Sequence, residues 1–453
     1  MSDPIETEQA PIPAARAREA RGMATASDKT RVVVLGGGSG GLELAAQLSA
    51  RSGLEVVLVD REPAHVWKPR LHEMAAGTVA TSLAEISFYL LGQLRGFRFE
   101  QGEVVSLDRR RRRVGLAAMP GPGGRPGAAA REIAYDILVV ALGGVTPDFG
   151  TAGVLENTIR LDGPEDADAF RDRFIALMIE ARESGEPAEI VIVGTGPTGT
   201  ELAAHLRHSE RGFLDPSRAK RQGKLLSITL IEAAPTIMPG IDETLRAQIV
   251  RRLRSLDVKI VPDAKISQVN ADELHTEKGE SWSSDLTVWA VGTAANPVLK
   301  TLGEFKFDSK GRIVVDDGLR STLDERIYVI GDSAAFTPPG EERAVPPTAQ
   351  VAGQQAIYLA DALPKSLKGQ SVSPFDFSDK GRLVSLGRAG TVGKIGFARK
   401  DDILIGGQFA LAAYHALERQ HQWRVLGKLR GSVAILADLV SPTKGPSLKL
   451  HGD

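Results

Sequence analysis

The chain has 453 residues, more than one typical hydrophobic core holds and enough for two or three domains. Lysine and arginine together number 56 against 57 aspartate and glutamate residues, and this balance argues against a dedicated nucleic-acid binder. The sequence contains no cysteine, which excludes disulfides, thiolate metal sites and redox-active dithiols.

Residues 1–30 are rich in alanine, arginine, proline and glutamate, and they lack the apolar middle region of a secretory signal. We expect them to form a disordered tail. The sequence has no run of about 18 or more apolar residues, so it predicts no helix that spans a bilayer.

A glycine-rich motif follows the first predicted strand. Residues 31–35 form an apolar strand, Gly36-Gly-Gly-Ser-Gly-Gly41 comes next, and a helical pattern follows. Gly36 makes the tight turn, Gly38 lets a pyrophosphate approach the backbone, and Gly41 lets the helix pack against the sheet. Asp60 ends the next strand, where its carboxylate can accept hydrogen bonds from an adenosine ribose. The segment therefore predicts a dinucleotide site at a helix N-terminus.

Two features lie between this motif and the next one. Arginine occupies every position from 109 to 113, and a glycine- and proline-rich stretch follows at 120–127, which favours a solvated hairpin or loop over a nucleic-acid patch. Residues 137–143 then predict a buried strand that ends in a tight turn at Gly143.

The glycine motif recurs in the middle of the chain. An apolar strand at 188–193 precedes Gly194-Thr-Gly-Pro-Thr-Gly199, and a predicted helix follows. Gly194, Gly196 and Gly199 have the same steric tasks as before, and two such motifs in this context are much harder to produce by accident than one. Glu232 ends the next strand, and a carboxylate there favours NADH because it would repel the 2′-phosphate of NADPH.

Two later strands also end in glycine. Residues 286–292 repeat the earlier strand and turn and end at Gly292, and residues 327–332 form a buried strand that ends in Gly-Asp. Asp332 stands where side chains enter the ligand crevice, so it could bond the ribityl chain of a flavin. A structural cap for the following helix is the alternative.

The character of the sequence changes after residue 371. Residues 383–397 predict short strands with glycine turns, and residues 408–440 predict one helix. Its apolar residues recur at spacings of three and four, and they are Leu426, Leu429, Val433, Leu436 and Val440. Basic residues populate the other side, and they are Arg419, Arg424, Lys428 and Arg430. This pattern is typical of a helix in a membrane interface, with Tyr414 and Trp423 at suitable depth. Packing on the body or on a second copy is the alternative.

The alternation of strands and helices predicts an α/β protein with two Rossmann-like dinucleotide-binding domains and a C-terminal α+β region. We place the first part of one nucleotide domain at 31–160 and its second part at 291–370. The other nucleotide domain is placed at 161–290, and a membrane-association or dimerisation region at 371–453.

Four further segments make the chain resemble the type II NADH:quinone oxidoreductases, the single-subunit, non-pumping respiratory dehydrogenases. They are Val59-Asp-Arg61 with Trp67-Lys-Pro-Arg-Leu-His-Glu73, Thr198-Gly-Thr-Glu-Leu202, Val345-Pro-Pro-Thr-Ala-Gln-Val-Ala-Gly-Gln354, and Leu448-Lys-Leu-His451. The resemblance implies that the first motif and Asp332 hold FAD without a covalent bond, and that the second motif and Glu232 hold NADH. It implies hydride transfer to the flavin and then reduction of a membrane quinone. It also implies cofactor contacts at Lys68, Gly143, Gly292 and Ala349.

The resemblance points to four catalytic candidates, and for each a purely structural or solvent-exposed role is the alternative. Glu201 is implied in proton delivery or quinone contact, whereas a helix N-terminal glutamate stabilised by the dipole is the alternative. Gln350 and Gln354 share a helix face and are implied to hold the quinone headgroup, whereas two exposed helix glutamines are the alternative. Lys394 could stabilise a reduced anion or simply be a solvated hairpin lysine.

The expected partners are a membrane quinone, the bilayer surface through the C-terminal amphipathic helix, and a second copy in a homodimer. The expected location is the cytoplasmic face of the inner (plasma) membrane, as a peripheral protein. No metal is expected, because His205 and His208 lie on one predicted helix without a convincing third ligand.

Two rival functions stay open. A soluble FAD-dependent NADH oxidase or ferredoxin-type reductase on the same scaffold would lack the amphipathic helix and the paired glutamines. A flavin-bearing redox-sensing or binding protein would turn over slowly. Sulfide:quinone oxidoreductases and dithiol–disulfide reductases need cysteine and are excluded.

Overall fold

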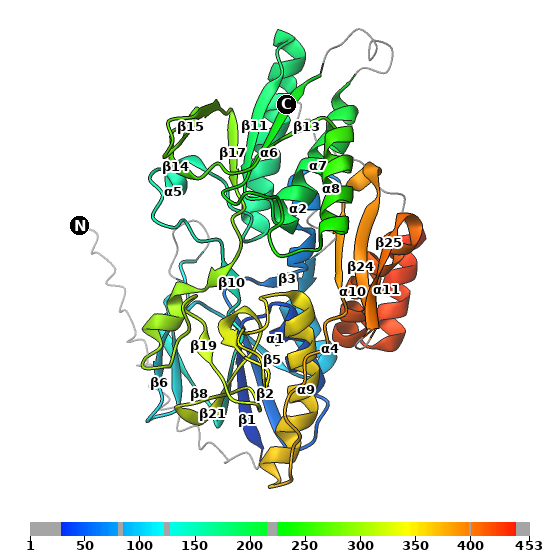
Figure 1. Cartoon of the computed structure of the whole chain (residues 1–453). Coiled ribbons are helices and arrows are strands. Elements are labelled where there is room, and N and C mark those ends of the chain that lie inside the picture. Colours follow the sequence, from blue (N-terminus) through cyan, green and yellow to red (C-terminus); the bar gives the residue numbers. More distant parts are fainter. Residues whose placement is uncertain (1–28, 80–84, 122–126, 215–223, 398–399, 441–453) are drawn as a thin grey trace, which may run out of the picture.

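The structure is a computed structural model, and it describes residues 29–79, 85–121, 127–214, 224–397 and 400–440. Nearly all of the tail expected at 1–30 lies outside these ranges, as does the closing segment at 448–451. Figure 1 shows two α/β units, one above the other, with a smaller group of strands and helices along one flank.

The first α/β unit is built on a six-stranded sheet in the order β20-β21-β9-β1-β2-β5. The strands are β1 (Thr30–Leu35), β2 (Leu54–Asp60), β5 (Arg98–Gln101), β9 (Ile137–Val140), β20 (Arg320–Ser321) and β21 (Asp324–Val329). All neighbours pair in parallel except β20 with β21. Residues 32–35 of β1 are fully buried, as expected for a parallel strand covered on both faces. The helices α1 (Ser39–Leu48) and α9 (Ala349–Leu367) pack against each other.

The second α/β unit has a four-stranded parallel sheet in the order β13-β12-β11-β17. Its elements are β11 (Ala188–Val193), β12 (Leu226–Ile231), β13 (Val258–Val261), β17 (Leu286–Trp289), α6 (Pro164–Ser184), α7 (Pro197–Phe213) and α8 (Glu243–Ser255). A three-stranded antiparallel sheet lies beside it, made of β14 (Ile266–Val269), β15 (Glu273–Thr276) and β16 (Ser281–Ser283). The prediction of two Rossmann-like folds is confirmed.

The remaining elements connect these two units or lie at their periphery. They are β3 (Ala64–Val66), η1 (Lys68–Arg70), α2 (Leu71–Ala75), β4 (Glu85–Ser87), α4 (Phe88–Arg95), β6 (Val104–Asp108), β7 (Arg113–Leu116), β8 (Arg131–Ala134), β10 (Gly144–Val145), α5 (Val154–Asn157), β18 (Ala294–Ala295), η3 (Pro297–Thr301), β19 (Ile313–Val314), η4 (Gly331–Ser333), β22 (Ala334–Ala335) and η5 (Gly387–Ala389). The first four residues of the five-arginine run form the turn between the antiparallel strands β6 and β7, and Arg113 begins β7, which confirms the predicted hairpin.

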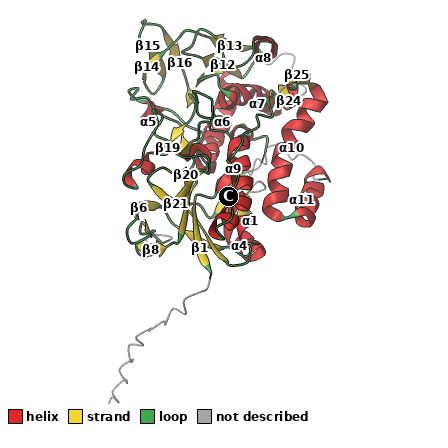
Figure 2. Ribbon diagram, turned by 60° about the horizontal axis from the view of Figure 1, so that its bottom comes forward, coloured by secondary structure: helices red, strands yellow, loops and turns green. Residues whose placement is uncertain are grey.

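The C-terminal region is an antiparallel sheet of β23 (Arg382–Ser385), β24 (Thr391–Phe397) and β25 (Lys400–Gly406), followed by two helices. The single helix predicted over 408–440 is wrong, because the chain divides into α10 (Gly407–Leu426) and α11 (Lys428–Val440). Gly427 ends α10 with a φ of 87°, a conformation that glycine adopts without strain. α10 packs on α1 and on β24, and α11 folds back beside it (Figures 1 and 2).

No helix within the described ranges is long and apolar enough to cross a membrane.

A short antiparallel ladder joins the two nucleotide-type units. Gly144 pairs with Ala295 and Val145 pairs with Ala294, so β10 and β18 lie directly against each other. These strands follow the two turns predicted at Gly143 and Gly292. The two turn motifs, far apart in sequence, therefore meet in space.

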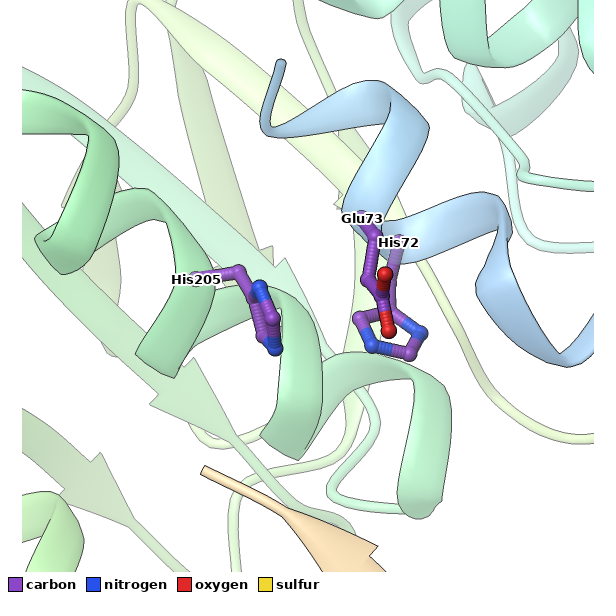
Figure 3. A group of neighbouring side chains, drawn as sticks. All are labelled: His72, Glu73 and His205. Atoms are coloured by element: carbon purple, nitrogen blue, oxygen red, sulfur yellow. The ribbon is translucent and has the colours of Figure 1, made fainter. Parts of the chain in front are cut away.

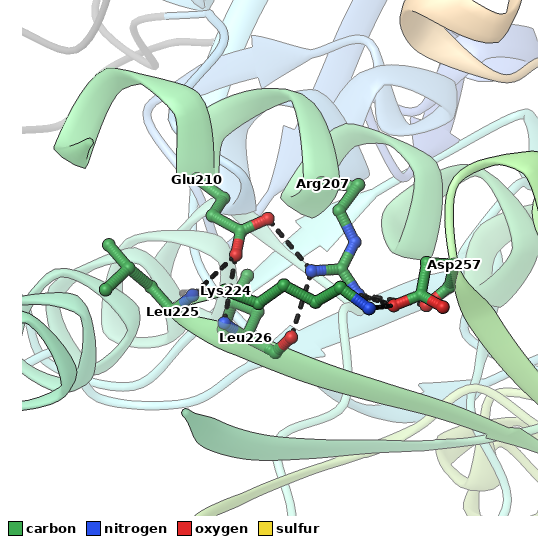
Figure 4. A network of polar contacts seen from close by, with 6 residues as sticks. All are labelled: Arg207, Glu210, Lys224, Leu225, Leu226 and Asp257. Carbon is green, nitrogen blue, oxygen red and sulfur yellow. Dashed lines mark hydrogen bonds and ion pairs between the residues drawn. The ribbon is translucent and has the colours of Figure 1, made fainter. Parts of the chain in front are cut away.

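The end of α7 is anchored by buried charges, drawn in Figure 4. Arg207 Nη1 donates to Glu210 Oε2 and to the Leu226 carbonyl, both at 2.9 Å. Glu210 Oε1 accepts from the backbone nitrogens of Leu225 and Leu226 at 2.8 and 3.0 Å. Each buried charge is thus paired and hydrogen-bonded, as burial requires. These bonds fix the first residues of β12 under the helix that carries the second glycine motif.

Candidate functional site

The first glycine motif has the sterics that a close turn requires. Gly36 has a φ of 101°, and a Cβ added there would lie 2.2 Å from the Ala141 carbonyl oxygen. A Cβ on Gly41 would lie 1.9 Å from the Gly36 oxygen, so α1 can approach the strand only because that atom is missing. A Cβ on Gly38 would meet nothing within 4 Å among the described residues. Gly38 therefore borders open space at the N-terminus of α1.

The second motif repeats this geometry. Gly194 has a φ of 103° and its added Cβ would lie 2.3 Å from the Ala290 oxygen, while one on Gly199 would lie 2.2 Å from the Gly194 oxygen. Gly196, the N-cap of α7, again borders open space within the described structure. Because helix N-termini carry unsatisfied amides and a positive dipole end, both openings suit a pyrophosphate.

The two predicted ribose carboxylates lie against these turns. Asp60 accepts hydrogen bonds from the backbone nitrogens of Gly37 at 2.5 Å and Glu62 at 2.9 Å. Glu232 accepts from the backbone nitrogens of Thr195 at 3.2 Å and Ala234 at 3.0 Å, and also from the Thr195 hydroxyl. Each carboxylate is therefore held beside its glycine turn, where a bound ribose would lie.

Asp332 lies in η4, between the carboxyl end of β21 and the start of β22. Burial raises the pKa of its carboxyl group, and the charges of Lys68 and Arg312 oppose this effect. Lys68 is exposed in η1, so the structure brings these two predicted residues within electrostatic reach of each other. Ala349 is the first residue of α9, whose N-cap is Thr348.

Gln355 is a site residue that the sequence did not reveal. Its side chain is fully buried, and its Oε1 accepts a hydrogen bond of 2.6 Å from the backbone nitrogen of Gly331. Within the described residues its Nε2 has no partner. A buried amide donor without a partner is costly, so this atom is suited to a ligand beside Asp332.

Glu201 lies in the first turns of α7 and reaches the C-terminal region. The backbone nitrogen of Ser385 donates to its Oε1 at 2.8 Å, and His72 Nδ1 lies 3.5 Å from its Oε2. Its side chain is only 6 % exposed. Burial raises the pKa of Glu201 well above its usual range, although the Ser385 bond opposes this. Burial therefore favours the neutral, protonated form of this carboxyl group.

The two predicted glutamines lie on one face of α9, as expected from their spacing. Gln350 Oε1 accepts from the backbone nitrogen of Lys380 at 2.7 Å. Gln354 Nε2 donates to the Ser378 carbonyl at 2.9 Å, and its Oε1 accepts from the Ser378 nitrogen at 3.1 Å. Both amides thus tie α9 to the segment before β23.

Lys394 lies apart from the other candidates. Its ammonium group contacts the carboxylate of Asp242 at 3.1 Å. Asp242 is the N-cap of α8, where it accepts hydrogen bonds from two backbone nitrogens. The lysine therefore links β24 to the second α/β unit through an ion pair.

Comparisons with known proteins agree with this geometry. The family model described as pyridine nucleotide-disulphide oxidoreductase matches residues 30–356. A type II NADH:quinone oxidoreductase of Haemophilus influenzae is 33% identical over 93% of this chain and 99% of its own length. The chain belongs to the type II NADH:quinone oxidoreductase family. A Staphylococcus aureus member is 28% identical over 82% of this chain and 90% of its own length.

Solved structures share the fold of this family member. The structure of NDH2 from Plasmodium falciparum in complex with NADH has a TM-score of 0.74 at 17% identity and covers 92% of this chain and 100% of its own. The sulfide:quinone oxidoreductase of Aquifex aeolicus has a TM-score of 0.70 at 17% identity, with 91% and 95% covered. The fold is thus shared with a sulfide:quinone oxidoreductase.

A buried polar chain links α10 to the first glycine motif, and sequence reasoning missed it. His421 Nδ1 lies 2.7 Å from Glu43 Oε1, and His421 Nε2 lies 3.0 Å from His65 Nε2. His65 Nδ1 lies 2.8 Å from the Gly37 carbonyl oxygen. Glu43, His65 and His421 are each at most 3% exposed. Helix α10 is therefore bonded directly to α1 and, through His65, to the loop expected to bind the pyrophosphate.

Hydrogen-bond chemistry places the protons of this chain. The Gly37 carbonyl can only accept, so His65 donates from Nδ1 and its Nε2 is an acceptor in the neutral ring. His421 then donates from Nε2, and its Nδ1 faces Glu43 without a hydrogen of its own. A protonated Glu43 completes the chain. Burial raises the pKa of Glu43 to about 7 against the opposing Arg424, and burial lowers the pKa of His421 to about 3.

Two residues of α10 turn inward: Arg424, which was expected on the basic side of the C-terminal helix, and Tyr414, which was expected at interfacial depth. Arg424 Nη1 lies 3.3 Å from Glu43 Oε2, so its guanidinium group donates to a buried carboxyl group. The Tyr414 hydroxyl is buried and has no partner within the described residues. Trp423 is 44% exposed, in keeping with its expected position. Periodicity alone could not distinguish the face that packs on α1.

We expect Gly196→Ala to weaken NADH binding and Gly199→Ala to lower thermal stability. Gly196→Ala places a methyl group in the open space at the N-terminus of α7, so the protein should keep its thermal stability but bind NADH at least about tenfold more weakly, a loss of about 1.4 kcal/mol. Gly199→Ala forces its methyl group against the Gly194 oxygen, so its melting temperature should fall. Thermal unfolding and NADH titration measure the two effects. Equal stability loss in both variants would contradict the assignment.

Glu43 should make stability depend on pH. Its pKa rises from 4.5 to about 7 on folding, so its contribution is fully present below pH 4.5 and is lost as pH rises through about 7. Glu43→Gln donates an amide hydrogen to His421 at any pH. Urea unfolding at about pH 6 and about pH 8 should therefore show a smaller loss of stability in this variant than in the wild type. Glu43→Ala should cost about 1–3 kcal/mol at pH 6. If the free energy of unfolding depended on pH equally in Glu43→Gln and in the wild type, the proposed proton between Glu43 and His421 would be refuted.

Proposed function

We propose that this chain transfers electrons from NADH through a bound FAD to a membrane quinone, without pumping protons. The observation that carries the proposal is the duplication of one nucleotide cradle, by which we mean a glycine turn that opens at a helix N-terminus. Two glycine turns of matching sterics open at two helix N-termini, and the β10–β18 ladder fixes the units that carry them against each other. Such a pair suits a resident dinucleotide and a diffusing one.

We assign FAD to residues 31–160 and 291–370, NADH to residues 161–290, and membrane association to 371–453. The first unit suits the resident cofactor, because it also contains the turn at Gly331–Asp332 and the buried Gln355 amide beside it. Gly38 and the α1 N-terminus would hold the pyrophosphate, and Asp60 the adenosine ribose. Bound flavin supplies a group that accepts a hydride and releases electrons singly or in pairs.

The second unit suits NADH. Gly196 and the N-terminus of α7 would receive its pyrophosphate, and Glu232 would accept hydrogen bonds from its ribose. The Glu232 carboxylate would repel an added 2′-phosphate, so we assign NADH rather than NADPH. The turns at Gly143 and Gly292, beside the ladder, lie between the two cradles, where the reacting ends of the nucleotides would meet.

Glu201 is our candidate proton donor. Reduction of a quinone takes two protons as well as two electrons, and a neutral carboxylic acid can supply one. The Ser385 nitrogen donates to Oε1, so in the protonated form the acidic hydrogen would lie on Oε2, which faces His72. His72 is therefore in position to orient that oxygen. Glu201 also connects α7 to β23, which places the acid between the NADH unit and the C-terminal region.

We assign the quinone headgroup to the end of α9 that carries Gln350 and Gln354. Their amides are neutral and would bind a carbonyl without adding charge. In the structure both are engaged by the backbone of residues 378–380, so a headgroup would replace or share these bonds. The ion pair of Lys394 with Asp242 favours a structural role for that lysine.

Anaerobic spectroscopy of the purified protein tests the proposed reaction. NADH should bleach the flavin, NADPH should do so at least about tenfold more slowly, and a short-chain quinone should restore the colour. Glu201→Gln should bleach normally but reoxidise about 100-fold more slowly, because general acid catalysis is lost. Glu243→Gln, an exposed glutamate on α8, is the control. A correctly folded protein that stays colourless with excess FAD would overturn the proposal.

We propose that α11 contacts the bilayer at the cytoplasmic face of the plasma membrane, as part of a peripheral homodimer. Leu429 is 81% exposed, and Val433 and Leu436 are each 62% exposed. Their spacing places them on one face of the helix, and Phe409 of α10 adds a side chain that is 84% exposed. Apolar side chains gathered in this way favour an interfacial helix.

Replacing Leu429, Val433 and Leu436 together by serine should abolish flotation of the protein with lipid vesicles. Each side chain then contributes little apolar area to the interface. Leu323→Ser, an exposed leucine near β21, should bind vesicles as the wild type does. If vesicle binding persists while sedimentation shows that a wild-type dimer has become a monomer, α11 is the dimer interface instead.

A further inference from the structure

Three buried side chains from two helices meet beside Glu201. His72 and Glu73 belong to α2, and His205 belongs to α7; Figure 3 shows the two rings facing each other with the carboxylate beside them. One ligand atom from each residue lies within 4.8 Å of the others. The three residues are 2%, 6% and 8% exposed, so water does not surround this group.

The two imidazoles direct atoms without partners into this group. Within the described residues, Nε2 of His72 and Nε2 of His205 are buried and make no hydrogen bond. A buried ring nitrogen left without a partner is costly, and native structures seldom tolerate two at one point. The two rings lie with their centroids 4.9 Å apart at 69°, so their nitrogens can converge on one position.

The opposite nitrogens of both rings are already oriented. His72 Nδ1 lies 3.5 Å from Glu201 Oε2, and His205 Nδ1 lies 3.3 Å from the Thr78 hydroxyl. Histidines that bind a metal commonly use one nitrogen for the ion, while the other contacts a carboxylate or another oxygen that fixes the ring. Both rings of this cluster show that arrangement.

Glu73 supplies the third ligand and part of the charge. Arg70 contacts Glu73 through Oε2, from Nε at 2.9 Å and from Nη2 at 2.8 Å. Oε1 is thus the oxygen that can turn to a metal. A carboxylate already held by a guanidinium group keeps its position, which favours binding over rearrangement.

We propose that His72, Glu73 and His205 form a binding site for a divalent ion of the zinc class. Two imidazoles and one carboxylate suit Zn²⁺, whereas Ca²⁺ and Mg²⁺ prefer oxygen ligands. Three protein ligands leave a fourth position for water, so this is an open site. Because α2 packs on α6 and α7 of the second α/β unit, an ion here would fasten the connecting helix α2 to α7. The expectation of no metal considered His205 only with His208 and did not foresee α2. Binding at this site does not depend on the proposed reaction.

Metal titration of the FAD-loaded, chelator-treated full chain tests the site. Calorimetry with Zn²⁺, and metal content after dialysis, should give one ion per chain. His205→Gln and Glu73→Gln should each weaken binding by at least about tenfold, since loss of even a supporting contact costs about 10–100-fold. His275→Gln, which removes a partly exposed histidine paired with Glu273, should bind like the wild type and is the matched control.

Thermal unfolding gives a second reading, in which each variant is compared with itself in the absence of the ion. Zn²⁺ should raise the melting temperature of the wild type and of His275→Gln, because an ion that binds only the folded chain stabilises it. It should not raise that of His205→Gln or Glu73→Gln. Absence of Zn²⁺ binding by the FAD-loaded wild type, or undiminished affinity in both cluster variants, would overturn the proposal.

Discussion

The nucleotide cradles depend on one steric constraint, the backbone contact that forms where a strand turns into a helix. At Gly36 and Gly194 the turn passes so close to the neighbouring strand that a Cβ would overlap a carbonyl oxygen. Gly41 and Gly199 then let the helix begin against the turn itself. Only this approach leaves helix amides free at the carboxyl edge of each sheet. The carboxylates at Asp60 and Glu232 acquire their positions from the same turns.

The C-terminal region is part of this site and is not merely attached to it. Helix α10 places His421 and Arg424 on Glu43, and its Glu418 lies 2.9 Å from Arg70 in the first α/β unit. Strand β23 adds the Ser385 bond to Glu201. These contacts are buried, so they exclude water from acids whose pKa values burial raises. The C-terminal region, which carries the exposed apolar residues of α11, thus also raises the pKa of the buried acids Glu43 and Glu201 by excluding water.

Local patterns allowed the two cradles to be predicted from sequence, because their glycines, strands and carboxylates lie within one supersecondary unit. The interior could not be predicted in the same way. His421 meets Glu43 across most of the chain, and His205 meets His72 from a distant part of the sequence, so no spacing reveals either contact. Gln350 and Gln354 were correctly placed on one helix face, yet the segment that binds them was unforeseen. Gly427 divides the last helix through a backbone conformation that apolar periodicity does not record.

The contact between α10 and α1 has a consequence for the order of folding. Helix α1 begins at the first glycine turn, and α10 leaves the ribosome long after it. Since domains fold as units during synthesis, the early nucleotide fold must stand without His421 and keep Glu43 and His65 facing solvent. Docking of α10 is then the event that seals this surface. A nascent chain stalled before residue 407 would expose two polar groups that the finished protein hides.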